Sequence, residues 1–299
     1  MRKRLISVGL TLPFYLIAMF NDRVIYLFHL CIVSTSIISS LEIFNMAQIS
    51  KKSSRTVIAT IIAIVFTYIY IITGNDLFTG DISKLFKIIS YDDINLDFSL
   101  KVVFALIAIL FSLNMFRVNV SFEEKGRAII TAIFCFMYVG VGVWHITLLR
   151  FFPAGEYLII FVLLCAWISD TGGYVIGRKI GKHKLINSAS PNKSVEGLVG
   201  MFIFTIPFTI LYYYLYSNGY LKYLLGEQTP HYSFTTLLIL SIILTITSFI
   251  GDMGESLIKR MYNTKDSSSM FPGHGGVFDM FDSVILTAPI AYYIFLYLL

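Results

Sequence analysis

The sequence is 299 residues long, with 57% hydrophobic, 16% aromatic and only 14% charged residues. An ordinary soluble domain has roughly 45–50% apolar residues, so this composition excludes a soluble protein and indicates an integral membrane protein. The formal net charge is +5. Cys31, Cys135 and Cys165 lie apart from one another inside apolar runs, which argues against a disulfide framework or a zinc site.

Nine apolar segments have about the length that a helix needs to cross a hydrocarbon core of roughly 30 Å. The first follows the sequence MRKR without a small-residue cleavage pattern, so we expect an uncleaved helix rather than a signal peptide. We expect an all-α, polytopic membrane bundle, because unpaired backbone groups are costly in lipid and the runs lack the alternation of barrel strands. The expected spans are 5–20, 24–44, 57–74, 102–116, 128–149, 157–169, 197–217, 233–250 and 284–299.

The Lys and Arg residues of the connecting loops indicate how the bundle is oriented. With nine spans and a cytoplasmic N-terminus, 17 of these 23 residues lie on the cytoplasmic side and six lie outside. Basic residues near helix ends are retained in the cytoplasm, so segments 170–196 and 251–283 are expected to share the cytoplasmic face. We divide the chain into N-terminal helices, 1–101, and a catalytic membrane domain, 102–299, with cytoplasmic inserts 169–197 and 251–283. The modest length and the lack of a long soluble extension lead us to expect a bacterial inner (plasma) membrane protein.

The first insert begins at Ser169 and reads SDTGGYVIGRKIGKHKLINSASPNKSVEG. We expect the preceding helix to end here, with a turn at Gly172 and Gly173, and the next helix to start at Ser194. Glycine allows a backbone to approach a phosphate closely, and Lys or Arg neutralises it. A basic loop beside a membrane is also typical of a topology determinant or an anionic-lipid contact, and this alternative stays open. The candidate substrate-binding residues in this insert are Asp170, Asn192 and Lys193.

The second insert concentrates polar residues in an otherwise apolar chain. Between Ser256 and Asp282 it reads SLIKRMYNTKDSSSMFPGHGGVFDMFD. We expect the preceding helix to end at Gly251 and Asp252. We also expect Asp279 to lie at the entrance of the last span, so that Asp252 and Asp279 could bind one ion. Mg²⁺ prefers one or two protein carboxylates together with water and substrate phosphate oxygens. The alternative is that these carboxylates only end helices in water, but their number beside two glycine-rich turns favours a Mg²⁺-dependent, phosphate-handling membrane enzyme.

Both inserts resemble the signature of the phosphatidate cytidylyltransferase (CDP-diacylglycerol synthase) family. The second insert is similar at every spacing, through Ser256, Lys259, Arg260, Lys265, Asp266, Pro272, His274, Gly275, Gly276, Asp279 and Asp282. The first insert resembles the family through Ser169, Asp170, Thr171, Gly172, Gly177, Arg178, Gly181, Ser190, Pro191, Asn192, Lys193, Glu196 and Gly197. The matching residues cover about the last 130 positions, whereas the N-terminal half is similar in hydropathy only.

The resemblance implies conversion of CTP and phosphatidate into CDP-diacylglycerol and pyrophosphate, with Mg²⁺ and, as a further expectation, a second, monovalent cation. It also allows a homodimer. Because phosphatidate already carries an ionised phosphate, catalysis would be mainly positioning and electrostatic stabilisation. The resemblance implies that the metal ligands are Asp252 and Asp279. The expected catalytic residues are Lys259, Arg260, Lys265, Asp266 and His274. The expected substrate-binding residues are Asp170, Asn192, Lys193, Ser256, Gly275, Gly276 and Asp282.

One position departs from the family pattern. Met280 stands where the family has Arg directly after the first closing Asp. Met cannot replace that charge, and we expect Lys259, Arg260 or Lys265 to take its role.

Two alternative functions remain open. One is a CTP-dependent lipid kinase or a cytidylyltransferase for another lipid phosphate; the other is a membrane transporter or non-catalytic scaffold whose charged inserts determine topology.

Overall fold

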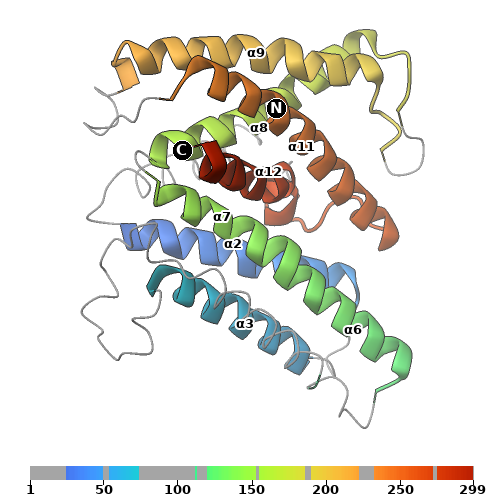
Figure 1. The fold of residues 1–299 in the computed structure, drawn as a ribbon. Coiled ribbons are helices and arrows are strands. Elements are labelled where there is room, and N and C mark those ends of the chain that lie inside the picture. The colour runs from blue at the N-terminus through green and yellow to red at the C-terminus, as the bar shows by residue number, and fades with distance from the viewer. Residues whose placement is uncertain are drawn as a thin grey trace.

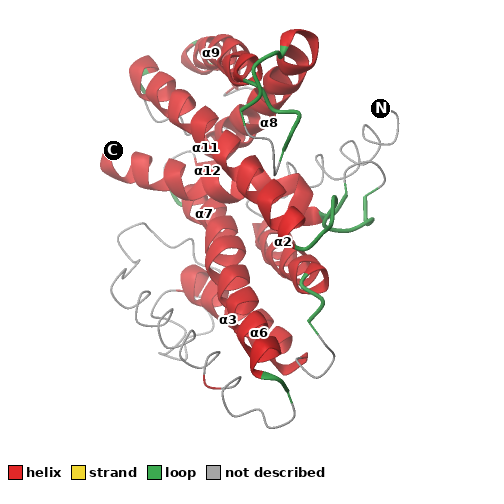
Figure 2. Ribbon diagram, turned by 90° about the vertical axis from the view of Figure 1, so that its right-hand side faces the viewer, coloured by secondary structure: helices red, strands yellow, loops and turns green. Residues whose placement is uncertain are grey.

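The computed structural model describes residues 25–49, 54–73, 112, 120–152, 155–185, 190–221, 232–271 and 275–298. Every regular element in these ranges is a helix, as Figure 2 shows. The helices are α2 (Ile25–Met46), α3 (Ser54–Thr73), α6 (Phe122–Phe134), α7 (Val141–Arg150), α8 (Gly155–Ile180), α9 (Val195–Ser217), α11 (Phe234–Met261) and α12 (Val277–Leu298). A π-helical turn, Cys135–Gly140, joins α6 to α7 so that the two form one continuous rod.

Six of the described helical segments are long and apolar enough to cross a membrane: Ile25–Met46, Phe122–Arg150, Gly155–Ile180, Val195–Ser217, Phe234–Met261 and Val277–Tyr297. The prediction of an all-α membrane bundle is therefore confirmed. Within α3, Thr56–Ile69 is a shorter apolar helix at the place of the expected third span. The expected span 5–20 and, apart from residue 112, the expected span 102–116 lie outside the described residues, so the count of nine stays a prediction.

Helix α12 occupies the middle of the bundle. Figure 1 shows α8, α9 and α11 on one side of it and α2, α3 and α6 on the other, and α12 packs against α2, α7, α8 and α11. Its apolar residues Phe278 and Phe295 are fully buried. At Gly142 of α7 an added Cβ would lie 2.6 Å from the carbonyl oxygen of Ile285, so this glycine lets α7 lie directly against α12. The polar start of α12 is thus surrounded by helices from both halves of the chain.

The expected end of the sixth span at residue 169 is wrong, because α8 continues to Ile180. Gly172 and Gly173 lie inside this helix and do not form a turn. An added Cβ on Gly172 would lie 2.5 Å from the carbonyl oxygen of Gly200, and a Cβ on Gly200 would overlap Ile176. Small residues at these positions let α8 and α9 approach closely, as in many membrane helix pairs. These glycines therefore serve helix packing, whereas the sequence suggested a phosphate-binding turn.

The expected boundaries at residues 250 and 284 are also wrong, because α11 continues to Met261 and α12 begins at Val277. The extension of α11 is polar but periodic: Asp252, Glu255 and Lys259 are three and four residues apart and share one helix face. Lys259 pairs with Glu255 within the helix, at 2.6 Å between Nζ and Oε1. Hydropathy detects only the apolar part of such a helix, so Asp252, Lys259, Asp279 and Asp282 lie on helices although the sequence assigned them to a polar insert.

Candidate active site

Three carboxylates from α11 and α12 converge at one point. One oxygen each of Asp252, Glu255 and Asp282 lies within 4.8 Å of the others, and we call these residues the carboxylate triad. Gly251 brings the two helices together, because a Cβ there would lie 2.9 Å from the Asp282 carbonyl oxygen and 3.1 Å from the Cα of Ser283. The close approach of α11 and α12 at Gly251 therefore also brings the carboxylates of the two helices together.

Asp170 joins the site from a third helix, α8. Its Oδ1 accepts a hydrogen bond from the Ser248 hydroxyl of α11 at 3.2 Å, and its Oδ2 accepts one from the Ser283 hydroxyl of α12 at 3.0 Å. The hydroxyl of Ser169 also lies 3.2 Å from that of Ser248. Hydrogen bonds from both neighbouring helices thus fix the carboxylate of Asp170 beside the triad.

Two lysines neutralise part of this negative charge. Lys193, in the segment before α9, pairs with Asp252 at 2.6 Å. Lys259 pairs with Glu255 at 2.6 Å and with Asp279 at 2.9 Å. The repulsion between two like unit charges about 4 Å apart is roughly 4 kcal/mol at the effective dielectric near a protein surface. Because the carboxylates outnumber the lysines, the site favours a further cation.

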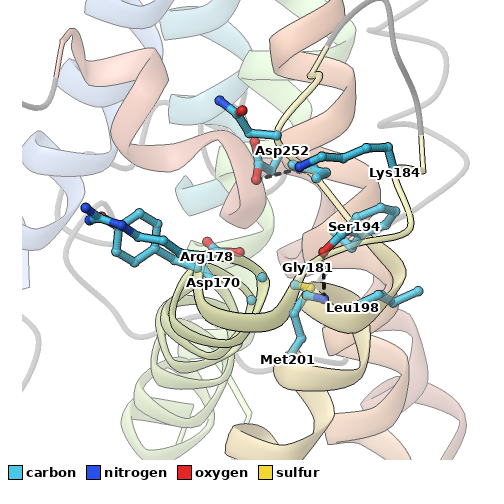
Figure 3. A pocket seen from close by; sticks show the side chains of 15 residues that line it. Asp170, Arg178, Gly181, Lys184, Ser194, Leu198, Met201 and Asp252 are labelled. Atoms are coloured by element: carbon cyan, nitrogen blue, oxygen red, sulfur yellow. Dashed lines mark hydrogen bonds and ion pairs between the residues drawn. The ribbon is translucent and has the colours of Figure 1, made fainter.

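A cavity of about 540 Å³ opens beside Asp170 and Asp252, between α8, α9 and α11 (Figure 3). This volume falls within the roughly 300–1,000 Å³ of small-molecule sites. The wall combines basic side chains, glycines and a few apolar groups, and the Lys193 ammonium lies 4.9 Å above the Phe249 ring. The lining residues are Asp170, Gly173, Tyr174, Gly177, Arg178, Gly181, Lys184, Asn192, Lys193, Ser194, Gly197, Leu198, Met201, Phe249 and Asp252.

The start of α9 shapes one wall of this cavity. Ser194 caps the helix by accepting a hydrogen bond from the Gly197 amide at 3.1 Å, which confirms the predicted helix start. Glu196 accepts a hydrogen bond from the Lys182 amide at 3.0 Å and lies 2.6 Å from Nδ1 of His183. These contacts tie the segment after α8 back to the start of α9, directly after Lys193.

The triad has the chemistry and spacing of a divalent-cation site. Two oxygens bound to one Mg²⁺ at about 2.1 Å are at most about 4.2 Å apart, so separations within 4.8 Å need only small side-chain adjustments. Oxygen ligands are also the kind that Mg²⁺ prefers. Asp252, Glu255 and Asp282 therefore offer oxygen ligands at separations that fit a Mg²⁺ ion.

Asp279, expected to share a metal with Asp252, has other partners. Its Oδ2 accepts hydrogen bonds from the amides of Gly276 at 2.7 Å and Ser267 at 2.8 Å and from the Ser267 hydroxyl at 2.9 Å. Its Oδ1 accepts one from Lys259 at 2.9 Å. The structure brings Asp282 rather than Asp279 into the triad, and the role of Asp279 as a ligand stays a prediction.

A sequence model of the cytidylyltransferase family matches residues 2–298. The chain belongs to this family. The match reaches almost the whole length, so it includes the N-terminal half, where the sequence alone showed similarity in hydropathy only. Membership of the cytidylyltransferase family therefore applies to α2 and α3 as well as to the two motifs.

Curated relatives within this family are proteins named phosphatidate cytidylyltransferase. The chain is 35% identical over 185 residues to one from Staphylococcus saprophyticus, 34% identical over 188 residues to one from Staphylococcus haemolyticus, and 33% identical over 186 residues to one from Staphylococcus aureus. Each match covers 60% of this chain and 66% of the relative, slightly less than two thirds. The resemblance drawn from the motifs is thus confirmed for the family.

The remaining predicted residues that the structure describes lie on α11, in the segment after it and on the cavity wall. Lys265 and Asp266 are exposed in the segment after α11, and Ser256 is half-buried on α11. Arg260 donates a hydrogen bond to the Thr264 carbonyl at 3.2 Å and so holds the end of its helix. Asn192 is exposed and lines the cavity. His274 lies outside the described residues, and the site roles of all these residues stay predictions.

Sequence reasoning missed two buried acidic residues, Glu255 of the triad and Glu42 of α2. Glu255 was overlooked because the helix was expected to end at residue 250, although its spacing from Asp252 and Lys259 is that of one helix face. Glu42 was overlooked because it lies in an apolar span of the N-terminal half. It is only 5% exposed, and a carboxyl group is rarely buried in a helix unless it is paired. A carboxyl group within an apolar span was therefore the signal in the sequence that Glu42 has a partner in the fold.

Proposed function

We propose that this protein is a phosphatidate cytidylyltransferase, which converts CTP and phosphatidate into CDP-diacylglycerol and pyrophosphate. The observation that carries the proposal is the carboxylate triad at the edge of a basic cavity, within helices long enough to span a membrane. The names of the Staphylococcus relatives support the lipid substrate and the place of the reaction in phospholipid biosynthesis.

The cavity is suited to a nucleoside triphosphate. Arg178, Lys184 and Lys193 supply positive charge on its wall, and Gly177 and Gly181 allow phosphate oxygens to approach the backbone. Its volume of about 540 Å³ matches a ligand of nucleotide size. We assign the triphosphate to the part of the cavity next to Lys193 and Asp252, because the positive charge and the triad meet there.

The reaction requires positioning more than acid–base chemistry. A phosphate oxygen of phosphatidate attacks the α-phosphorus of CTP, and the bond to the bridging oxygen of the β-phosphate breaks, so pyrophosphate leaves with the electron pair. Phosphatidate is already ionised, so no general base is needed. The protein must hold two polyanions in line and stabilise the charge that develops on the leaving group. Lys193 and Arg178 are placed to do this from the cavity wall.

Asp252, Glu255 and Asp282 would hold the Mg²⁺ ion, and Asp170 would support them from α8. A bound Mg²⁺ neutralises negative charge on the triphosphate and on the departing pyrophosphate. We include a second, monovalent cation in the proposal, because carboxylates outnumber lysines around the triad. Lys193 would then exchange its partner Asp252 for a substrate phosphate.

The proposal includes the topology derived from the sequence: nine spans, a location in a bacterial inner membrane and an active site on the cytoplasmic face, where CTP is available. The cavity and the segments 181–185 and 262–271 lie at the ends of α8 and α11 that the loop charges assign to the cytoplasm. A homodimer is part of the proposal through the family resemblance alone.

The test uses the purified, detergent-solubilised full chain with CTP labelled at either the α- or the γ-phosphate, phosphatidate and Mg²⁺. We expect α-label in a CDP-lipid and γ-label in pyrophosphate. Label from the γ-position on a lipid would instead show a lipid kinase. Product formation with an isoprenoid or ether lipid phosphate, but none with phosphatidate, would indicate a different lipid substrate. The complete absence of nucleotide chemistry, with solute transport intact, would overturn the proposal.

A further inference from the structure

Glu42 is a buried carboxylate from α2 that reaches across the bundle to the start of α12. Its Oε1 accepts hydrogen bonds from the Val277 amide at 3.0 Å and the Ser268 hydroxyl at 2.7 Å. Its Oε2 accepts them from the Phe278 amide at 2.9 Å and the Ser267 hydroxyl at 2.9 Å. Four donors from two separate segments, more than 200 residues away in sequence, therefore meet on one side chain.

The position of Glu42 explains why α12 begins where it does. The first amides of a helix lack partners within the helix, and negative charge is stabilised at that end. Glu42 provides both the acceptors and the charge for the Val277 and Phe278 amides, although it belongs to a different helix. An added Cβ on Gly276 would overlap both carboxylate oxygens of Glu42. The second glycine of the His-Gly-Gly motif is thus the residue that makes room for Glu42.

The contacts continue from Glu42 to the triad. The Ser267 hydroxyl lies 2.9 Å from Glu42 and 2.9 Å from Asp279, so it stands between the two carboxylates. Asp279 pairs with Lys259, and Lys259 pairs with Glu255 of the triad. Asp282, another triad member, lies one helical turn after Asp279 on the helix that Glu42 caps.

We infer that Glu42 is a positioning residue for the active site: it fixes the start of α12 and the 267–268 segment, and thereby sets the place of Asp282 and Lys259. This inference rests on the proposed function, since it assigns Glu42 a role in that site. Glu42 itself touches neither the cavity nor the triad. Its influence is geometric, and an error of about 1 Å in a catalytic arrangement costs on the order of 100-fold in rate.

The first measurement is independent of activity. Hydrogen exchange of the full chain in detergent, followed by mass spectrometry of peptides covering 262–281, reports on the amides of Ser267, Val277 and Phe278. We expect Glu42→Gln to speed their exchange at least about tenfold, because one charged acceptor pair is lost from buried donors. The matched control is Glu156→Gln, which removes a carboxylate paired with Arg150 at 3.3 Å near the start of α8 and should leave these peptides unchanged.

The second measurement separates positioning from stability. If wild type makes CDP-lipid, Glu42→Gln should lower kcat by about 10- to 100-fold while KM for CTP changes little. Glu156→Gln should lower the midpoint of thermal unfolding without this loss of kcat. If Glu42→Gln does not fold, Ser268→Ala removes one of the four donors and should produce the same two changes at smaller size.

Unchanged exchange in Glu42→Gln would overturn the inference, and so would faster exchange with wild-type kcat. If wild type shows no cytidylyl transfer, the proposed function fails, and the inference is then decided by the Mg²⁺-induced rise in thermal stability. Loss of this Mg²⁺-induced rise in Glu42→Gln, with the rise retained in Glu156→Gln, would support a positioning role for Glu42 at the carboxylate triad. If both variants retain the rise, that role is overturned.

Discussion

Asp279 and Asp282 are one helical turn apart on α12, yet their carboxylates have different partners. Asp279 accepts four hydrogen bonds from the segment before α12 and from Lys259. Asp282 lies with Asp252 and Glu255 in the triad. The sequence motif contains both residues at fixed spacing, but only the structure shows which of them meets Asp252.

The metal requirement of variants distinguishes these two roles. We expect Asp282→Asn to raise the Mg²⁺ concentration for half-maximal activity by on the order of 100-fold, since loss of even a supporting partner costs about 10- to 100-fold. Asp279→Asn should instead lower thermal stability and kcat at saturating Mg²⁺, because its partners are the amides and Lys259. Activity titrations with Mg²⁺ decide the question. A large rise for Asp279→Asn and none for Asp282→Asn would restore the pairing of Asp252 with Asp279.

Lys193 lines the cavity and contacts the triad through its 2.6 Å ion pair with Asp252. We expect Lys193→Met to lower kcat/KM for CTP by about 10- to 100-fold, because a hydrogen bond to a charged group contributes about 1.5–3 kcal/mol. The control is Lys179→Met, which removes an exposed lysine of α8 that does not line the cavity. Equal kcat/KM values for the two variants would exclude a substrate contact by Lys193.

At the scale of helices, glycines determine how closely the elements of the site approach. Gly172 and Gly200 bring α8 onto α9, and Gly251 brings α11 onto α12. Each contact lies within a few residues of an acidic or basic side chain of the site. Helix packing and the assembly of charges are therefore set by the same short segments, which explains why these motifs combine glycines with charged residues.

Substitution of Gly172 tests this packing directly. We expect Gly172→Ala to destabilise the protein by about 1–3 kcal/mol, because its Cβ would meet the backbone of Gly200, which cannot move without shifting α9. Gly126→Ala is the control: it lies in α6 with nothing within 4 Å of the added atom. It should stabilise α6 by roughly 0.5–1 kcal/mol, the usual advantage of Ala over Gly in a helix. Thermal unfolding in detergent measures both, and equal midpoints would contradict the packing argument.

The sequence predicted which segments form helices better than it predicted where they end. Apolar runs located α2, α9 and the middle of α11, and Ser194 correctly indicated a helix start. The boundaries at 169, 250 and 284 failed because polar residues with helical spacing continue α8 and α11 and begin α12. Hydropathy records where a helix meets lipid, whereas these extensions are stabilised by contacts between helices. Glu255 was missed for the same reason, and Glu42 because its partners are distant in sequence.

Across the whole molecule, the site depends on both halves of the chain. The proposed division at residue 101 stays a prediction, but Glu42 from the N-terminal part holds the start of α12 in the C-terminal part. Figure 1 shows α12 with α2 and α3 of the N-terminal part on one side and α8, α9 and α11 of the C-terminal part on the other. Removal of the N-terminal helices should therefore affect the site itself as well as the surrounding bundle.

The orientation of the bundle determines whether CTP can reach the cavity, and engineered cysteines test it. Lys182→Cys and Ser269→Cys replace exposed residues near the site, whereas Ser217→Cys lies at the far end of α9. Because Cys31, Cys135 and Cys165 are buried, the wild-type chain should react little with a membrane-impermeant maleimide. We expect cysteines 182 and 269 to react only in inside-out vesicles and cysteine 217 only in intact, outer-membrane-free cells. Reaction of 182 and 269 from outside the cells would place the cavity on the wrong side for CTP and contradict the proposed location of the active site.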